Sequence, residues 1–259
     1  MRTLKDFDPF LKALHQSICE SSQLETDLPL EQIMKQPRLM VALNHATPIS
    51  WVPAISLLAP AAAEAGGDDR IAMGVVDKFF YSNPLTKPVA EYVTQSDRPL
   101  GFEELLKHFL GSERRDLVIF PEGARTFFGD LTQIQPFRSP RFIELAIRAQ
   151  APILLAVHRG SETWNLELAL PREWGAFLMP FSRFFGQGLM EAGSLNLPIL
   201  LKKIPHFHMK LHLYTPALYE SDLSGSEAER RSQLQAEAEN IRALMQEMYD
   251  SLPAARVRT

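Results

Sequence analysis

Short apolar runs that stop at polar turns constrain the fold of this chain more than any other feature. The segment RLMVAL (38–43) ends at NHATPIS (44–50), and LVIF (117–120) ends at PEGART. A third run covers residues 153–157. Runs of this length, bounded by turns and separated by helix-like segments, are typical of buried strands. The sequence therefore predicts an α/β fold with a mixed, mainly parallel sheet flanked by helices.

The two ends of the chain carry helix signals. Apolar residues from Leu4 to Ile18 recur at spacings of three and four, which predicts an amphipathic helix within residues 1–20. Ser226 and Glu229 form a capping-box pattern, which predicts a C-terminal helix over 226–252. We find no linker between these ends, so residues 1–259 are expected to form a single domain.

Composition and charge limit the function classes and the compartment. The net charge of −4 argues against a general nucleic-acid binder, which needs a basic face. Cys19 is the one cysteine, so an intramolecular disulfide is impossible and a reducing compartment is favoured. The first ten residues, MRTLKDFDPF, lack the pattern of a signal peptide. We therefore expect a cytoplasmic protein with no transmembrane segment.

The first polar turn contains a candidate base. Asn44 and His45 directly follow a predicted strand, and ligand sites in α/β sheets gather at the carboxyl ends of strands. A histidine at such a position can act as a general base near neutral pH. The alternative is a histidine that only satisfies backbone groups of the turn.

The second polar turn contains a candidate anion-binding group. Pro121 ends the strand and Gly123 permits a tight turn, so Glu122 and Arg125 can project from the edge of the sheet. The planar guanidinium of an arginine suits a pair of phosphate oxygens. The alternative is a solvated turn with a local ion pair.

These two turns resemble conserved blocks of the glycerolipid acyltransferase family, of the lysophosphatidic acid acyltransferase type. NHATPIS is similar to the first block, which reads His, four residues, Asp. FPEGART (120–126) is similar to the third block, Phe-Pro-Glu-Gly-Thr-Arg-Ser. The segments DKFF (77–80) and SDR (96–98) resemble the second block, and APILL (151–155) resembles the fourth. The likeness covers roughly residues 38–158, and the family fold agrees with the predicted one.

The resemblance implies an O-acyltransferase. Such an enzyme moves a fatty acyl group from acyl-CoA or acyl carrier protein, as co-substrate, to the hydroxyl of a lysophospholipid such as lysophosphatidic acid. His45 is then the general base, and Ser50 holds His45 where the family has Asp. The other matched residues, implied to bind substrate, are Glu122, Gly123, Arg125, Lys78 and Arg98. No metal and no further cofactor is required, because the bound hydroxyl attacks the thioester directly.

Serine at position 50 is the main departure from the family pattern. A serine hydroxyl can orient an imidazole but cannot offset the charge that the ring gains during the reaction. Two alternatives therefore stay open. One is a catalytically weakened lipid-binding or regulatory protein on the same fold, and the other is an acyltransferase with a different acceptor.

Residues 174–190, WGAFLMPFSRFFGQGLM, suggest contact with a membrane surface. The segment is rich in aromatic residues and methionine, and Arg183 is its one charged residue. Such segments can lie in a bilayer interface. We therefore expect peripheral contact with the cytoplasmic face of a membrane. The alternative is that the segment packs on the core, as we expect for the helix over 4–18.

Overall fold

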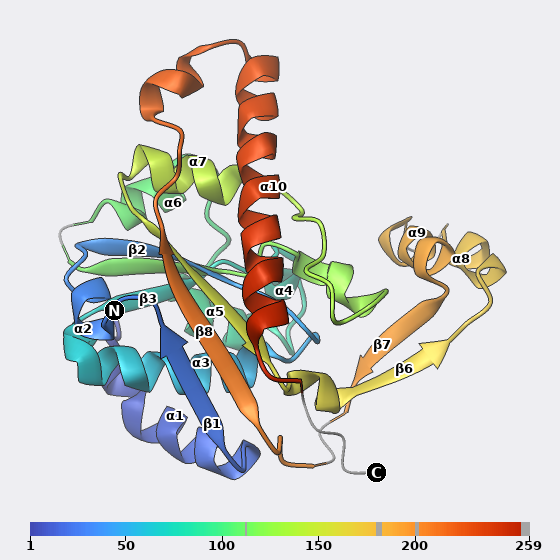
Figure 1. The fold of residues 1–259 in the computed structure, drawn as a ribbon. Helices are drawn as coiled ribbons and strands as arrows, with labels where there is room; N and C mark the ends of the chain where they lie inside the picture. Colours follow the sequence, from blue (N-terminus) through green and yellow to red (C-terminus); the bar gives the residue numbers. More distant parts are fainter. Residues whose placement is uncertain (112, 180–182, 200–201, 255–259) are drawn as a thin grey trace.

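A mixed sheet forms the centre of the protein. In the computed structural model, which describes residues 1–111, 113–179, 183–199 and 202–254, six strands lie in the order β1-β8-β5-β2-β4-β3 (Figure 1). These strands are β1 (Ser22–Thr26), β2 (Arg38–Leu43), β3 (Ile71–Gly74), β4 (Arg115–Ile119), β5 (Ile153–Arg159) and β8 (Phe207–Tyr214). Only the β5–β8 pair is antiparallel among them. The predicted fold class, a mainly parallel sheet in a single domain, is confirmed.

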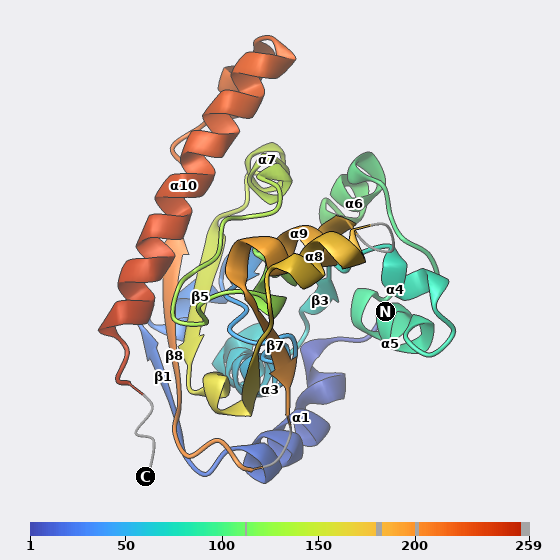
Figure 2. The same ribbon diagram turned by 90° about the vertical axis from the view of Figure 1, so that its right-hand side faces the viewer.

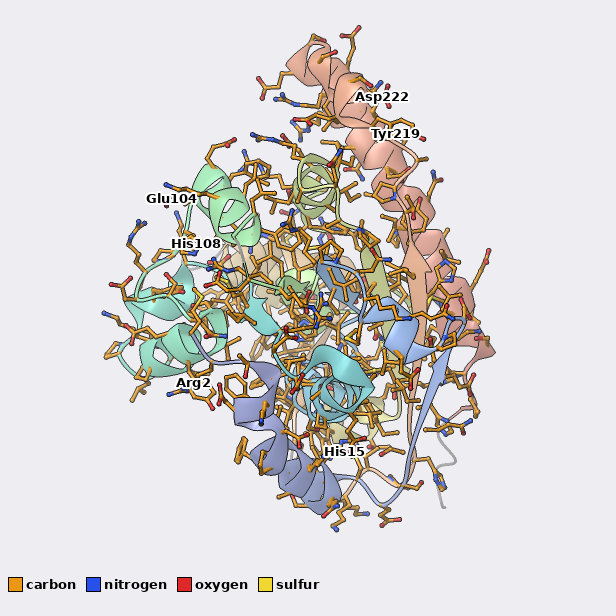
Figure 3. The ribbon with its side chains drawn as sticks, turned by 90° about the vertical axis from the view of Figure 1, so that its left-hand side faces the viewer. Arg2, His15, Glu104, His108, Tyr219 and Asp222 are labelled. Carbon is orange, nitrogen blue, oxygen red and sulfur yellow. The ribbon has the colours of Figure 1, made fainter. Side chains whose placement is uncertain are left out.

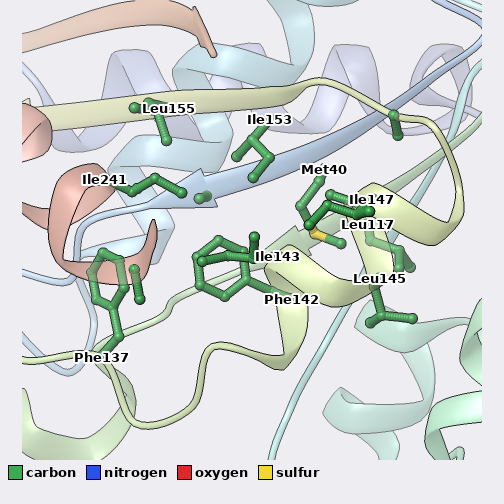
Figure 4. Packing of buried hydrophobic residues seen from close by; sticks show 14 of the residues in the cluster. Met40, Leu117, Phe137, Phe142, Ile143, Leu145, Ile147, Ile153, Leu155 and Ile241 are labelled. Atoms are coloured by element: carbon green, nitrogen blue, oxygen red, sulfur yellow. The ribbon is translucent and has the colours of Figure 1, made fainter. Parts of the chain in front are cut away.

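Helices cover both faces of this sheet (Figure 1). The helices are α1 (Leu4–Ile18), α2 (Leu30–Ile33), α3 (Trp51–Ala62), α4 (Phe79–Ser82), α5 (Lys87–Thr94), α6 (Phe102–Phe109), α7 (Arg141–Arg148), α8 (Glu173–Leu178), α9 (Arg183–Ala192) and α10 (Glu227–Ser251). Side chains alternate across β2, so Met40 packs with α7 and α10, whereas Leu39 and Val41 pack with α1 and α3. Figure 4 shows the first of these two cores, with Met40 beside Ile147 of α7 and Leu117 of β4.

The helices at the two ends of the chain form where the sequence predicts them. The hydroxyl of Ser226 accepts the Glu229 N–H at 3.3 Å, and the Glu229 carboxylate accepts the Ser226 N–H at 2.8 Å. This capping box starts α10. Within the described residues, none of the helices combines the length and the apolar character that crossing a bilayer requires.

A buried ion pair joins the β3–β4 side of the sheet to the turn before β2. Arg70 donates from Nε to Asp116 at 2.6 Å, and a second guanidinium nitrogen donates to the Gln36 carbonyl at 2.7 Å. Asp116 also accepts the Leu39 N–H at 2.9 Å. Both charged side chains are almost completely buried. Their hydrogen bonds compensate for the loss of water around the two charges.

The segment between β5 and β8 forms an arm that projects from the body (Figure 1). We call residues 165–198 the arm. Its strands β6 (Asn165–Ala169) and β7 (Ser194–Pro198) pair antiparallel and carry α8 and α9. These two helices lie side by side (Figure 2), because Gly175 and Gly186 let their backbones approach closely. The strands β6 and β7 are not predicted from the sequence.

The chain segments that precede and follow the arm lie against each other. Gly160, with φ of 116°, lies against the backbone of His206, and a Cβ at position 160 would come within 2.2 Å of the His206 carbonyl oxygen. Between this junction and the arm, Trp164 is buried in the core and donates from its ring N–H to the Lys202 carbonyl at 2.7 Å. The base of the arm therefore belongs to the body.

Candidate active site

The polar turns after β2 and β4 meet at the carboxyl edge of the sheet. The parallel register pairs Ala42 with Ile119, so both turns begin at the same level. A single carboxylate joins them, because Glu122 accepts the His45 backbone N–H at 2.7 Å. The sequence correctly places these two turns together, as the geometry of parallel strands requires.

The buried side chain of Glu122 accepts hydrogen bonds from two backbone segments. Its other oxygen accepts the Gln135 N–H at 2.6 Å. Burial raises the pKa of the Glu122 carboxyl to about 8, although both N–H donors oppose that shift. Since both oxygens are engaged, Glu122 shapes the site by holding the backbone of His45.

The ring of His45 is set up to act as a base. Its Nδ1 lies 3.3 Å from the Gly123 carbonyl oxygen and 3.5 Å from the Thr126 hydroxyl. A carbonyl only accepts, so this contact favours the tautomer with hydrogen on Nδ1 and leaves Nε2 unprotonated. Burial lowers the pKa of His45 to about 4, with the Gly123 and Pro48 carbonyls opposing the shift. The ring is therefore neutral at physiological pH.

Nε2 of His45 is enclosed as well as unprotonated. It is buried, and no group in the described part of the chain makes a hydrogen bond to it. The ring of Phe120 packs beside the imidazole, with 4.9 Å between the ring centroids. A substrate hydroxyl must therefore reach Nε2 through a local opening of the site.

Ser50 does not hold His45 by a hydrogen bond. Its side chain is buried at the start of α3, and its hydroxyl has no hydrogen-bond partner among the residues described. The hydroxyl of Thr47, in the same turn, is likewise buried without a partner. The group in contact with Nδ1 of His45 is the Gly123 carbonyl.

The predicted phosphate-binding cations differ in their availability. Arg125 lies in the short 3-10 helix η2 (Gly123–Phe127) and is exposed, and its guanidinium makes no hydrogen bond or ion pair within the described ranges. Lys78, at the start of α4, is also exposed. By contrast, Arg98 donates two hydrogen bonds to Glu104, at 2.7 and 3.1 Å. Figure 3 shows Glu104 at the outer edge of the molecule, so this pair holds Arg98 at the periphery.

Arg138 is a cation that the sequence analysis misses. Its side chain packs against Gly123, where an added Cβ would lie 3.5 Å from the Arg138 Cδ. Its backbone N–H donates to the Pro121 carbonyl at 2.8 Å, and its guanidinium pairs with Asp77. No motif marks this arginine, because a loop of irregular structure brings it back to the turn.

His158 lies behind the site and is also missed. It is fully buried at the end of β5, and its backbone exchanges two hydrogen bonds with the Asn44 side chain, at 2.8 and 3.0 Å. Its ring Nε2 donates to the Asn44 carbonyl at 3.1 Å. Burial lowers the pKa of His158 to about 3, so it is a neutral neighbour of His45. Asn44 thus fixes the backbone immediately before the candidate base.

Comparison with protein-family models gives no match for this chain, and comparison with curated proteins gives none either. Within the ranges that the structure describes, His, Cys, Asp and Glu side chains form no group of three that could hold a metal ion. The site offers a neutral imidazole with an enclosed Nε2 and, on the adjoining turn, an arginine whose guanidinium has no partner in the part of the chain that the structure describes.

Proposed function

We propose that this protein is an O-acyltransferase of the glycerolipid type. It would transfer a fatty acyl group from an acyl thioester, acyl-CoA or acyl carrier protein, to the hydroxyl of a lysophospholipid such as lysophosphatidic acid. The observation that carries the proposal is the placement of His45, whose Nδ1 lies 3.3 Å from the Gly123 carbonyl oxygen and whose Nε2 is buried without a hydrogen-bond partner among the described residues. The resemblance of both turns to the acyltransferase blocks supports the same conclusion.

The chemistry follows from this arrangement. The acceptor hydroxyl donates to Nε2 of His45, and its oxygen attacks the carbonyl carbon of the thioester. The proton passes to Nε2, a carbon–oxygen bond forms, the carbon–sulfur bond breaks, and the imidazolium returns the proton to the leaving thiolate. The Gly123 carbonyl stabilises the imidazolium through Nδ1–H, and Glu122 keeps the His45 backbone in place.

A thioester-consumption assay with purified protein tests the proposal. Release of free thiol would be followed with acyl-CoA and with acyl carrier protein, against acceptors that bear a phosphate monoester, a phosphodiester or no phosphate. Acceptor-dependent thiol release with transfer of the acyl group supports an acyltransferase. If thiol is released only with acceptors that lack a phosphate monoester, the protein is instead an acyltransferase with a different acceptor.

A lipid-binding or regulatory protein is the second candidate. Two observations favour it, namely the enclosed Nε2 of His45 and the absence of a Ser50 hydrogen bond to the ring among the described residues. Binding of lysolipid without thiol release from either donor would support this candidate and contradict the acyltransferase proposal.

Arg125→Ala is expected to raise the KM for a phosphate-bearing acceptor by about tenfold or more, with a much smaller effect on the KM of the thioester donor. A hydrogen bond to a charged group contributes roughly 1.5–3 kcal/mol, and the Arg125 guanidinium, on the turn that adjoins the base, has no partner among the described residues. Lysine should restore little, because its ammonium cannot bind two phosphate oxygens in one plane. Steady-state kinetics with both substrates measure the effect.

Arg98→Ala is the matched control, because that guanidinium is already engaged by Glu104. It should change the acceptor KM by no more than about twofold, as expected for an exposed ion pair. Equal changes in both KM values with Arg125→Ala, or none, would remove Arg125 from the phosphate site.

The arm provides the surface for the proposed contact with the cytoplasmic face of a membrane. Large apolar side chains of α8 and α9 are exposed, with Trp174 at 58%, Phe177 at 73% and Met190 at 42%. The exposure of these three side chains supports the proposed membrane contact of residues 174–190, of which residues 180–182 lie outside the described residues. Amphipathic helices with aromatic residues on one face bind at bilayer interfaces.

The protein is expected to sediment with anionic liposomes, and Trp174→Asp/Phe177→Asp should abolish most of this sedimentation. Charge on these two side chains opposes burial in the interface. Tyr219→Asp is the matched control, since Tyr219 is equally exposed at 73% but lies near α10, away from the arm (Figure 3). Equal loss in the control, or no sedimentation of the unaltered protein, would contradict the proposal.

A further inference from the structure

One buried side chain connects the arm to the turn after β4, the turn that contacts the candidate base His45. Asn196 of β7 is 1% exposed. Its amide nitrogen donates to the Gly129 carbonyl at 3.0 Å and to the Thr126 carbonyl at 3.3 Å, while its amide oxygen accepts from Asn165 at 3.0 Å. A buried amide satisfied in this way fixes the groups around it.

The contacts continue from Asn196 to His45 through a single residue. Thr126, whose carbonyl Asn196 holds, is itself 1% exposed. Its hydroxyl donates to the Gly123 carbonyl at 3.3 Å and lies 3.5 Å from Nδ1 of His45. The Gly123 carbonyl is the group in contact with Nδ1. The arm and the base are therefore joined by three consecutive polar contacts.

We propose that Asn196 is a positioning residue for His45. It fixes residues 123–129 against the arm and thereby keeps the Gly123 carbonyl on Nδ1 of the base. Asn196 lies outside every segment that resembles an acyltransferase block. The kinetic consequence rests on the proposed function, whereas the effect on the His45 ring does not.

The loss of Asn196 should leave the arm in place. Phe185 of α9 packs against Phe127 and Phe128, with centroid distances of 5.7 and 5.5 Å. Gly188 of the same helix also lies against the Phe128 ring. These apolar contacts hold the arm independently of the amide, so a change at position 196 loosens the turn without releasing the arm.

Asn196→Ala is expected to move the titration of His45 upward by about one pH unit or more, towards that of a solvated histidine. Loss of two hydrogen bonds loosens the turn and admits water to a ring whose pKa is lowered mainly by burial. Two titratable groups, Glu122 and His158, face His45, and neither is changed in the variant. NMR titration of the ring measures the shift and requires no turnover.

The kinetic expectation is a fall in kcat of about 10–100-fold with both KM values nearly unchanged, since the base is misplaced while the substrate contacts remain. Asn196→Asp should behave like the alanine variant, because its carboxylate cannot donate to the two carbonyls. Asn165→Ala is the matched control, because Asn165 donates to Asn196 and, among the described residues, makes no hydrogen bond to residues 123–129. Circular dichroism would confirm folding of all three variants.

The outcomes separate cleanly. A shifted His45 titration in both Asn196 variants, with the control unchanged, supports the proposal even if no acyl transfer is found. An unshifted titration overturns it, whatever the activity. Equal shifts in Asn165→Ala would also overturn it, because the effect would then come from the arm as a whole.

Discussion

His45→Ala is expected to lower the rate of acyl transfer from thioester to acceptor by about 10²–10⁴-fold. The physical reason is the loss of the group that we propose accepts the hydroxyl proton. The imidazole is neutral at physiological pH and its Nε2 has no hydrogen-bond partner among the described residues, so this nitrogen is available to accept the proton. Thiol release and product formation would be followed under single-turnover conditions, so that product release does not mask the chemical step.

His206→Gln is the control, because His206 lies outside the candidate site and contacts Ser21. The same assay run against pH tests the state of the base. Since burial lowers the pKa of His45 to about 4, the neutral form predominates above that pH, and kcat/KM should fall only on the acid side of about pH 5. Unchanged turnover in His45→Ala would remove His45 as the base.

Arg70→Met is expected to lower the free energy of unfolding by about 3–5 kcal/mol, because it leaves the buried carboxylate of Asp116 without its partner. The pair lies inside the protein, where water cannot compensate the remaining charge. Adding Asp116→Asn should recover part of the loss, since asparagine is neutral and its amide oxygen can still accept the Leu39 N–H. Equilibrium unfolding in urea measures all three forms.

Lys87→Met is the matched control, because it also removes a cation but from an exposed pair with Glu91 at 3.6 Å. Exposed ion pairs contribute about 0–1 kcal/mol, so this variant should be nearly as stable as the unaltered protein. A loss of less than about 1 kcal/mol in Arg70→Met would mean that the Arg70–Asp116 pair does not stabilise the fold.

The sheet was predictable where its strands are apolar and local signals bound them. β2, β4 and β5 are buried runs that stop at turns, and β8 alternates with Phe207, Met209 and Leu211 fully buried. β1, β6 and β7 were not predicted, because sequences such as SQLET and NLELA are partly polar and exposed. Their pairing is decided by distant partners, as when β1 adds to β8 at the far end of the chain.

The site was predictable to the level of its turns but not of its contacts. The meeting of His45 with the turn that carries Glu122 and Arg125 follows from parallel strands, and the structure has it. The contact between Nδ1 and the Gly123 carbonyl has no sequence signature, because every residue has a carbonyl. The role of Asn196 could not be predicted either, because an asparagine in a polar strand has no sequence signature that shows its partners.

The junction of Gly160 with His206 has a consequence for how such a protein can change over evolutionary time. Because the segments on either side of the arm are in contact there, the β5–β8 pairing does not depend on what lies between residues 165 and 198. The six-stranded sheet can therefore tolerate insertions, deletions or replacement of that part, because its register is set by its own strands. The surface that the arm presents can therefore diverge while the turns after β2 and β4 stay constant, provided that a replacement still makes the amide contacts of position 196 with the carbonyls of residues 126 and 129.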